Sequence, residues 1–352
     1  MDIQHLKHIL NQFKIDTQDV TFQSITTGYI NDTFLVLKSE KPLYILQCIN
    51  SNVFKQVESL MLNIELALAK LQSNEYKTIS LLKTIEGKSF YKQNKSYWRL
   101  MTFIEGSTTY NTTTNPKVAF EAGRIIGEFH NLLKDESPGV FTDIIPNFNN
   151  LPFRITEFKK AIEKVSETRK GVAKNGIDFA IKTHPTFDTF YKAKLPLRIC
   201  HNDTKLNNIL FSKSNEALCL IDLDTIMKGY FHYDFGDAVR TIVNTANEDE
   251  IELSKITFNT TLFEAFVDGL SKNASFLTNK EIELLPIATA LMPFIHGLRA
   301  LTDYLNGNIY YKVAYENQNL ERCVSLFHFT KLSLQHEAYM SSVINLKLKK
   351  QN

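Results

Sequence analysis

The sequence predicts an α+β protein in which a small antiparallel β-rich lobe precedes a larger helical lobe. Residues 19–49 alternate polar and apolar side chains in short runs, a period that is typical of half-buried strands. From residue 117 onward the apolar residues recur every three to four positions, as in helices that pack on a core. The polar, turn-rich stretch "EGSTTYNTTTNP" separates the two patterns. We therefore expect a β-rich lobe at 1–104 and a helical lobe at 105–352.

The elements of the β-rich lobe can be assigned in chain order. The N-terminal stretch "MDIQHLKHILNQFKID" predicts an amphipathic helix, and "DVTFQSITTG", "DTFLVLKS" and "PLYILQCIN" predict three strands. An apolar stripe that includes Leu60, Ile64 and Leu68 predicts a helix at about 55–72. Two further strands are expected near 89–93 and 96–104.

The helical lobe begins at Pro116, a residue type that suits the first turn of a helix. Ala122, Ile125, Phe129 and Leu133 mark residues 117–134 as a helix that packs on the core. Further long helical patterns occur around 152–168, 178–193, 255–270, 280–305 and 315–340.

The composition is that of an ordinary globular protein. The chain has 352 residues, 43% of them hydrophobic and 22% charged, and its net charge of +2 does not favour nucleic-acid or membrane partners. The N-terminus has no apolar signal-peptide core, and the apolar runs fall short of a membrane span. The four cysteines lack the spacing of metal ligands, so we expect buried, reduced thiols. These features predict a cytoplasmic protein.

The stretch "CHNDTKLNNILF" at 200–211 gathers more polar side chains than a core would use. Two apolar runs, 209–211 and 218–221, flank a polar turn and predict a β-hairpin centred on Asn215. Asn208 lies seven residues before that centre and Asp222 seven after it, so the hairpin places them side by side. An amide oxygen beside a carboxylate is a suitable site for Mg²⁺.

Asp203 is the candidate base that takes a proton from an attacking hydroxyl, an arrangement that phosphoryl transfer requires. Lys205 either neutralises the γ-phosphate or pairs with Asp203. His201 is expected to brace the loop backbone, and Asp224 is either a second metal ligand or a structural hydrogen-bond partner. We count Asp203 and Lys205 as the catalytic candidates.

Two motifs resemble known ones without fitting them. Residues 234–236 read "DFG", a motif that supplies the metal-binding aspartate in protein kinases. Here Asp234 is too far along the chain from Asn208 to pair with it across the hairpin. We therefore expect Asp234 and Asp237 to anchor the loop or a helix start. "EGKS" at 86–89 lacks the earlier glycine of a phosphate-binding loop, since position 82 is Leu82.

The sequence resembles the aminoglycoside phosphotransferase and choline kinase superfamily, whose two-lobed fold is like that of protein kinases. Within it, the N-acetylhexosamine 1-kinase group is most similar, over "TTGYINDTFLV", "YILQCIN", "HNDTKLNNILF", "IDLDTIMKG", "YDFGDAVR", "GLRALTDYLNGNIYYKV" and "NQNLERC". The resemblance implies transfer of a phosphoryl group from ATP, with Mg²⁺, to the anomeric hydroxyl of N-acetylglucosamine or N-acetylgalactosamine. It also implies that Asp203 is the base and that Asn208 and Asp222 bind the metal.

The nucleotide site departs from the usual pattern of this superfamily. The third strand normally carries a lysine that holds ATP phosphates, and the equivalent position here is Gln47. An amide brings no charge, so more of the electrostatic work would fall on Mg²⁺ and Lys205. The loop from Gly28, with Asn31 and Thr33, is expected to curl over the phosphates.

The hinge between the lobes is expected in "WRLMTFIEG" at 98–106. Its backbone at Thr102, Phe103 and Ile104 would bind the adenine edge in a kinase-like fold.

The acceptor site is expected near the C-terminal half. Arg299 and Asp303 share one face of a predicted helix, and with Tyr304 they either form a surface pair or line the sugar pocket. Arg154 and Asn149 are further candidates, although Asn149 stands where the sugar kinases are expected to have a histidine.

Two other functions remain open at this point. The same fold phosphorylates aminoglycosides, choline or other sugars, but an amine-bearing acceptor would call for several carboxylates or an aromatic cage near Asp203. A catalytically silent nucleotide- or sugar-binding regulator would be favoured by loss of Asp203, Asn208 or Asp222, and all three are present. The expected partners are ATP and a small acceptor, without nucleic acid or membrane.

Overall fold

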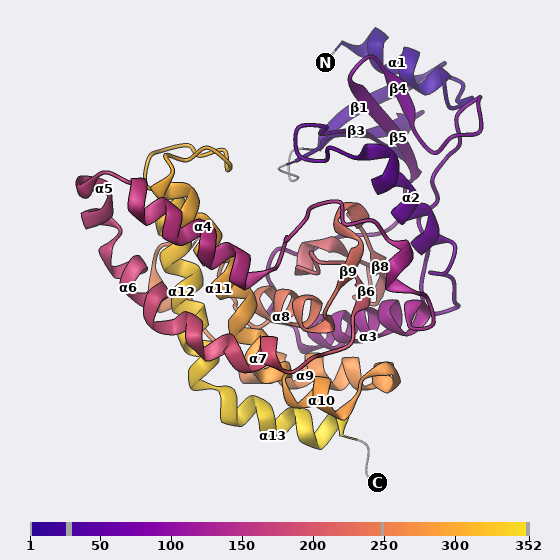
Figure 1. Cartoon of the computed structure of the whole chain (residues 1–352). Coiled ribbons are helices and arrows are strands. Elements are labelled where there is room, and N and C mark those ends of the chain that lie inside the picture. The colour runs from indigo at the N-terminus through magenta and orange to yellow at the C-terminus, as the bar shows by residue number, and fades with distance from the viewer. Residues whose placement is uncertain (1, 26–29, 248–249, 350–352) are drawn as a thin grey trace.

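The computed structural model of the chain describes residues 2–25, 30–247 and 250–349. Figure 1 shows a small lobe of strands and a larger lobe of helices below it. This two-lobed α+β arrangement confirms the predicted fold class. The predicted division of the chain after residue 104 stays a prediction, although the last strand of the small lobe ends at Thr102 and the first helix of the large lobe begins at Pro116.

The small lobe is built on one antiparallel sheet with the strand order β1-β2-β3-β5-β4. The strands are β1 (Val20–Ile25), β2 (Asp32–Lys38), β3 (Lys41–Ile49), β4 (Tyr91–Gln93) and β5 (Ser96–Thr102). Each overlaps a stretch in which the sequence predicts a strand. The predicted N-terminal helix is α1 (Ile3–Asn11), and the helix after the third strand is α2 (Val57–Leu68).

The two faces of this sheet have different surroundings. Helix α1 covers one face, where Leu6, Val36, Trp98 and Leu100 are buried in a common core. Side chains alternate along a strand, so the residue between Trp98 and Leu100 points to the opposite face. That residue is Arg99, and its partners show that this face looks into the cleft between the lobes.

The helical lobe carries two short antiparallel strand pairs among its helices. One pair is β6 (Arg198–Cys200) with β9 (Met227–Gly229), and the other is β7 (Ile209–Phe211) with β8 (Ala217–Leu220). The helices are α3 (Pro116–Leu133), α4 (Leu151–Lys164), α5 (Glu167–Val172), α6 (Lys174–Thr183), α7 (Asp188–Lys192), α8 (Phe231–Ile242), α9 (Thr260–Ser271), α10 (Asn279–Glu283), α11 (Leu285–Leu305), α12 (Gln318–Gln335) and α13 (Glu337–Leu348).

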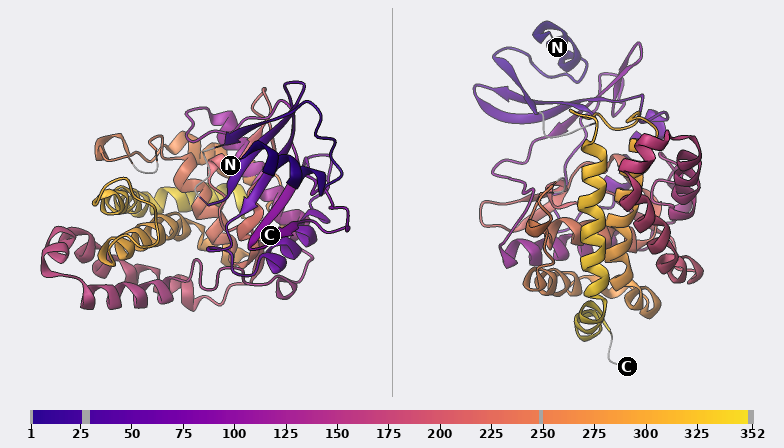
Figure 2. Two further views of the ribbon diagram at one scale, coloured as in Figure 1. Left: turned by 90° about the horizontal axis from the view of Figure 1, so that it is seen from above. Right: turned by 90° about the vertical axis from the view of Figure 1, so that its left-hand side faces the viewer.

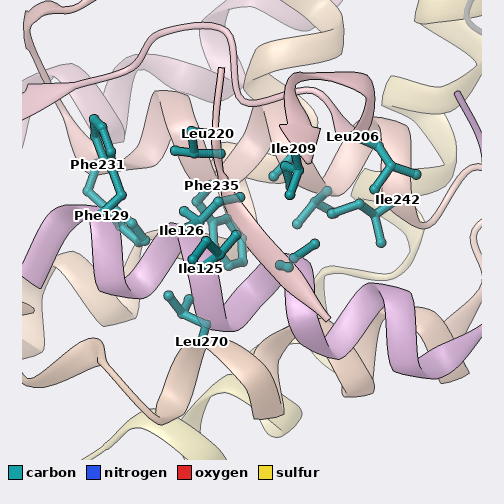
Figure 3. Packing of buried hydrophobic residues seen from close by; sticks show 14 of the residues in the cluster. Ile125, Ile126, Phe129, Leu206, Ile209, Leu220, Phe231, Phe235, Ile242 and Leu270 are labelled. Atoms are coloured by element: carbon teal, nitrogen blue, oxygen red, sulfur yellow. The ribbon is translucent and has the colours of Figure 1, made fainter. Parts of the chain in front are cut away.

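The core of this lobe lies directly under the polar loop at 201–208. Figure 3 shows Ile125, Ile126 and Phe129 of α3 packed with Ile209, Leu220 and Phe235 from the hairpin and α8. Helices α3 and α9 approach closely at Gly123 and Gly269. A Cβ atom at Gly123 would stand 2.0 Å from the carbonyl oxygen of Phe266, so a side chain there would force the helices apart.

A second core joins α4, α6, α7, α11 and α12 into an arm beside the cleft (Figure 1, left; Figure 2). The prediction of one continuous helix at 178–193 is wrong. Pro185 cannot continue a helix, and the chain forms α6, a single turn at His184–Phe187 and then α7.

The expectation that no apolar run approaches a membrane span also needs correction. By length and composition, helix α11 is long and apolar enough to cross a membrane, with a mean hydropathy of 1.2 over its most apolar stretch. Most of that stretch, 83%, is buried inside the protein, as in a core helix. All four cysteines are unpaired, as expected, and only Cys48 is partly exposed.

Candidate active site

The loop at 201–208 is held from below by Asp234, the aspartate of the "DFG" stretch. The fully buried Asp234 carboxylate accepts hydrogen bonds from the backbone amides of His201 at 2.8 Å and Asn202 at 2.6 Å. It also accepts one from His130 Nε2 at 2.9 Å. Two of these bonds hold the backbone of the loop and the third ties the carboxylate to α3, which confirms the expected anchoring role.

His201 braces the loop, as expected. Its Nδ1 accepts a hydrogen bond from the amide of Asp203 at 3.2 Å, so Nε2 carries the proton and donates to the carbonyl of Ile221 at 2.8 Å. His201 therefore ties the loop to the end of the following hairpin.

The hairpin forms as predicted, with Asn215 at its turn in a left-handed conformation at φ 64°. The amide of Ile221 donates to the carbonyl of Asn208 at 2.9 Å, so Asp222 follows directly beside Asn208. Asn208 Nδ2 in turn donates to Asp203, at 2.8 Å to its carboxylate Oδ2 and 2.8 Å to its carbonyl. The structure thus brings Asp203, Asn208 and Asp222 together.

Asp222 is exposed, and its carboxylate accepts no hydrogen bond from the residues that the structure describes. Although Asp222 is exposed, desolvation by neighbouring protein atoms, followed by the charges of Asp224 and Asp203, raises the pKa of its carboxyl group to about 6. Asn208 Oδ1 also lacks a partner among the described residues. Hard oxygens beside crowded carboxylates form a donor set that fits a divalent cation such as Mg²⁺.

Asp203 and Lys205 form an ion pair at the mouth of this group. Lys205 Nζ lies 3.0 Å from Asp203 Oδ2, and both side chains remain about one quarter exposed, at 26% and 22%. Asn208 and Lys205 both contact Oδ2 of Asp203.

Asp224, two residues after Asp222, is linked to the small lobe instead. Its Oδ1 accepts a hydrogen bond from Arg99 Nη1, and its Oδ2 accepts one from Asn31 Nδ2 at 2.6 Å. Both oxygens are thus engaged by residues of the β-rich lobe, which matches the structural alternative for Asp224.

Gln47 lies at the centre of the expected nucleotide site. Its Oε1 accepts from Arg99 Nε at 2.9 Å and Nη2 at 2.7 Å, and its Nε2 donates to Thr33 Oγ1 at 3.0 Å. Arg99 was not among the residues predicted for this site. The signal was an arginine inside the apolar strand "YWRLM", a residue type that is rarely buried without a purpose. Gly28 lies outside the described residues.

The backbone of the expected hinge at 98–106 makes hydrogen bonds to neighbouring segments and within itself. The amide of Thr102 donates to Ser80 at 3.0 Å, and the amide of Phe103 donates to Leu43 at 3.0 Å. The carbonyl of Ile104 accepts from Ser107 Oγ at 2.6 Å. In the described part of the chain, the amide of Ile104 makes no backbone hydrogen bond.

Three of the expected acceptor residues meet beside the loop. Asn149 is buried, with its Nδ2 3.5 Å from Asn202 Oδ1 and its own oxygen unpartnered in the described chain. The Arg299 guanidinium lies 4.8 Å from the ring centre of Phe148. Arg154 donates to the Phe148 carbonyl at 3.0 Å. Burial and then the charge of Arg299 lower the pKa of Arg154, so the two arginines are close neighbours.

The other two expected acceptor residues support the fold of this region. Asp303 makes no ion pair with Arg299. It accepts instead from the amides of Ile309, Tyr310 and Tyr311 at 2.7–3.0 Å and shapes the loop after α11. Tyr304 is 2% exposed and therefore belongs to the core.

The comparisons with known proteins agree with this geometry. Residues 21–258, which are more than half of the chain, match the phosphotransferase enzyme family known as APH. The chain belongs to this family. The predicted superfamily is thereby confirmed, whereas the N-acetylhexosamine branch stays a prediction.

Several solved structures share the fold of this phosphotransferase. A microcompartment-associated aminopropanol kinase is 15% identical with a TM-score of 0.64, and the match covers 97% of this chain and 99% of that one. An amicoumacin kinase in complex with AMP-PNP, Ca²⁺ and Ami is 13% identical with a TM-score of 0.60, and the match covers 95% of this chain and 94% of that one. A choline kinase from Cryptosporidium parvum is 12% identical with a TM-score of 0.60, covering 98% and 99%.

Proposed function

We propose that this phosphotransferase transfers the γ-phosphoryl group of ATP to the anomeric hydroxyl of an N-acetylhexosamine, with Mg²⁺, and releases the sugar 1-phosphate. The observation that carries the proposal is the group of Asp203, Asn208 and Asp222 on one loop and hairpin, facing nucleotide-site residues of the other lobe. Phosphoryl transfer needs a base, a metal site and a phosphate site close together.

Each residue of the loop has a distinct part in this reaction. The carboxylate of Asp203 orients the sugar hydroxyl and accepts its proton. Lys205 stands beside it and stabilises the charge on the transferred group. Asn208 and Asp222 would hold Mg²⁺, which would neutralise phosphate charge when bound. Asp224 is assigned to the contact between the lobes, because both of its oxygens are already engaged there.

The anomeric hydroxyl suits a carboxylate base of ordinary strength. It is more acidic than the other hydroxyls of a sugar, because the ring oxygen withdraws charge. The sugar C–O bond is not broken in the transfer, so the product keeps the anomeric configuration of the bound sugar.

The adenine of ATP is assigned to the space beside the hinge. Ile45 and Met101 lie on the same cleft face as Gln47 and Arg99, two residues along each strand. Both are apolar and partly buried. Partly buried Leu210 and Ile221 lie on the hairpin of the other lobe. The backbone from Thr102 to Ile104 would bind the adenine edge, where the amide of Ile104 has no backbone partner in the described chain.

The acceptor side favours a neutral sugar over an amine. Arg154 and Arg299 both lie at Phe148, next to the loop that carries Asp203, and each lowers the attraction of the site for another cation. The neighbouring carboxylate of Glu157 is already paired with Arg154 at 2.7 Å. Arginine donates well to the oxygen of an acetamido group or a hydroxyl, and Asn149 offers an unpartnered amide oxygen.

A coupled ADP-release assay tests the proposal. N-acetylglucosamine, N-acetylgalactosamine, glucose, galactose, kanamycin and choline would be supplied as acceptors with ATP and Mg²⁺, and Asp203→Asn would serve as the blank. We expect release with an N-acetylhexosamine that disappears in the variant. Turnover only with kanamycin or choline would instead assign the protein to the amine-accepting enzymes of the same family.

Substitution of Arg299 separates the acceptor site from the nucleotide site. Arg299→Gln is expected to raise the KM for the sugar and to leave the KM for ATP unchanged. Arg169→Gln is the matched control, because Arg169 packs on the core side chain of Tyr304. Equal effects of the two substitutions would contradict the assignment of Arg299.

A further inference from the structure

The third strand of the small lobe has no cation at the position where this superfamily usually has one. Gln47 takes that place on β3, and it pairs across the sheet with Thr33 of β2 on one side and Arg99 of β5 on the other. Cross-strand neighbours point to the same face, so all three side chains look into the cleft. A permanent positive charge therefore stands one strand away from the expected position.

Arg99 is more buried than an ordinary surface arginine, since only 2% of its side chain is exposed. Burying a guanidinium is costly unless its charge and its donors are matched. Gln47 accepts two hydrogen bonds from this guanidinium, and Asp224 accepts one. A guanidinium has further N–H donors beyond these, in a fixed fork that suits phosphate oxygens.

We propose that Arg99 is the cation of the small lobe that contacts the ATP phosphates, and that Gln47 and Asp224 hold its guanidinium in place. The proposal rests on ATP being the phosphoryl donor, as the proposed function states, and not on the identity of the acceptor. The positive charge has thus moved from the third strand to the fifth, and the amide at position 47 orients it.

The contact with Asp224 has the same form as a known device in protein kinases, where a strand lysine is held by a glutamate of the next helix. The corresponding helix here, α2, does not supply that partner. Glu58 is exposed and lies 3.9 Å from Lys92, and Glu65 pairs with Lys83 at the surface. Asp224 therefore takes the place of the helix glutamate, and it does so from the opposite lobe.

Binding of nucleotides without an acceptor tests this assignment directly. Calorimetry would compare adenosine, AMP, ADP and ATP with Mg²⁺ on the wild-type protein and on Arg99→Met. We expect Arg99→Met to lower the affinity for ATP by about 10- to 100-fold, the range for a lost charged hydrogen bond. The affinity for adenosine should stay within about twofold of the wild-type value. Arg99→Lys should retain part of the ATP affinity because the charge remains.

Two further variants separate charge from structure. Gln47→Lys in the Arg99→Met background returns a cation to the third strand, and it should recover part of the lost ATP affinity. Arg198→Met is the matched control, since Arg198, like Arg99, forms an ion pair with a buried carboxylate, that of Glu281. It should leave the difference between ATP and adenosine unchanged.

Equal weakening of adenosine and ATP by Arg99→Met, or no weakening of either, would overturn the proposal and leave Arg99 a purely structural residue. Should Arg99→Met fail to fold, the Nε–H resonance of Arg99 in the wild-type protein decides the matter. It should shift on addition of ATP but not of adenosine, and identical responses would again overturn the proposal. Failure of the sugar assay alone would leave these binding results untouched, so the two proposals fail separately.

Discussion

The role of Asp234 can be tested by removing its charge without changing its shape. Hydrogen bonds from the amides of His201 and Asn202 and from His130 Nε2 all end on this buried carboxylate. Asparagine keeps a single acceptor oxygen, and its NH₂ group would face one of these donors. A buried donor without an acceptor costs about 1–3 kcal/mol, and the remaining bonds lose their charge assistance. We therefore expect Asp234→Asn to lower the free energy of unfolding by about 3 kcal/mol.

The consequences for activity separate loop anchoring from metal binding. Denaturant unfolding would be measured together with the Mg²⁺ concentration that gives half-maximal turnover. Asp234→Asn should reduce kcat, because the base on the loop is displaced, while the Mg²⁺ requirement stays close to that of the wild type. A rise of more than about tenfold in that requirement, with unchanged stability, would refute the reasoning and make Asp234 a metal ligand.

Asp222→Asn provides the opposite pattern as a control. It should raise the Mg²⁺ requirement by at least about tenfold. The metal-free protein should keep its stability or gain some, because one of several mutually repelling carboxylates is removed.

The other predictions concern stability. Gly123→Ala should destabilise the protein by about 3 kcal/mol or more, since its Cβ would overlap the Phe266 carbonyl. Gly171→Ala has open space around it and should be neutral or stabilising by about 0.5–1 kcal/mol. Equal effects of the two substitutions in denaturant unfolding would contradict the packing account. Burial lowers the pKa of His232 to about 4, below its unfolded value of 6.5. The unfolded chain then binds a proton that the folded one does not, so stability falls with falling pH between these values, and His232→Gln should reduce the slope by about 1.4 kcal/mol per pH unit. An unchanged slope in the variant would show that His232 titrates normally.

The catalytic loop and its hairpin could be predicted because their information is local. The equal spacing of Asn208 and Asp222 about Asn215 was enough to place both at the open end of the hairpin, and the structure has them there. The role of Asp234 followed from the same argument, since it lies too far along the chain to join that pair.

Arg99 and Asp303 could not be assigned in this way because their partners come from distant segments. The place of Arg99 depends on the register of β3 against β5 and on the closure of one lobe on the other. The pairing of Arg299 with Asp303, suggested by helical spacing, loses to the backbone amides of the loop after α11. These amides provide several donors at once to a buried carboxylate.

The most direct test of the proposed reaction is phosphorus NMR of the product made from ATP and N-acetylglucosamine labelled with ¹⁸O at the anomeric position. We predict a phosphate ester that couples to the anomeric proton and carries the isotope shift of a P–¹⁸O bond, because the sugar hydroxyl attacks and its C–O bond survives. A product without the isotope shift, or one whose phosphorus couples to the two protons of the exocyclic CH₂ group, would contradict the account.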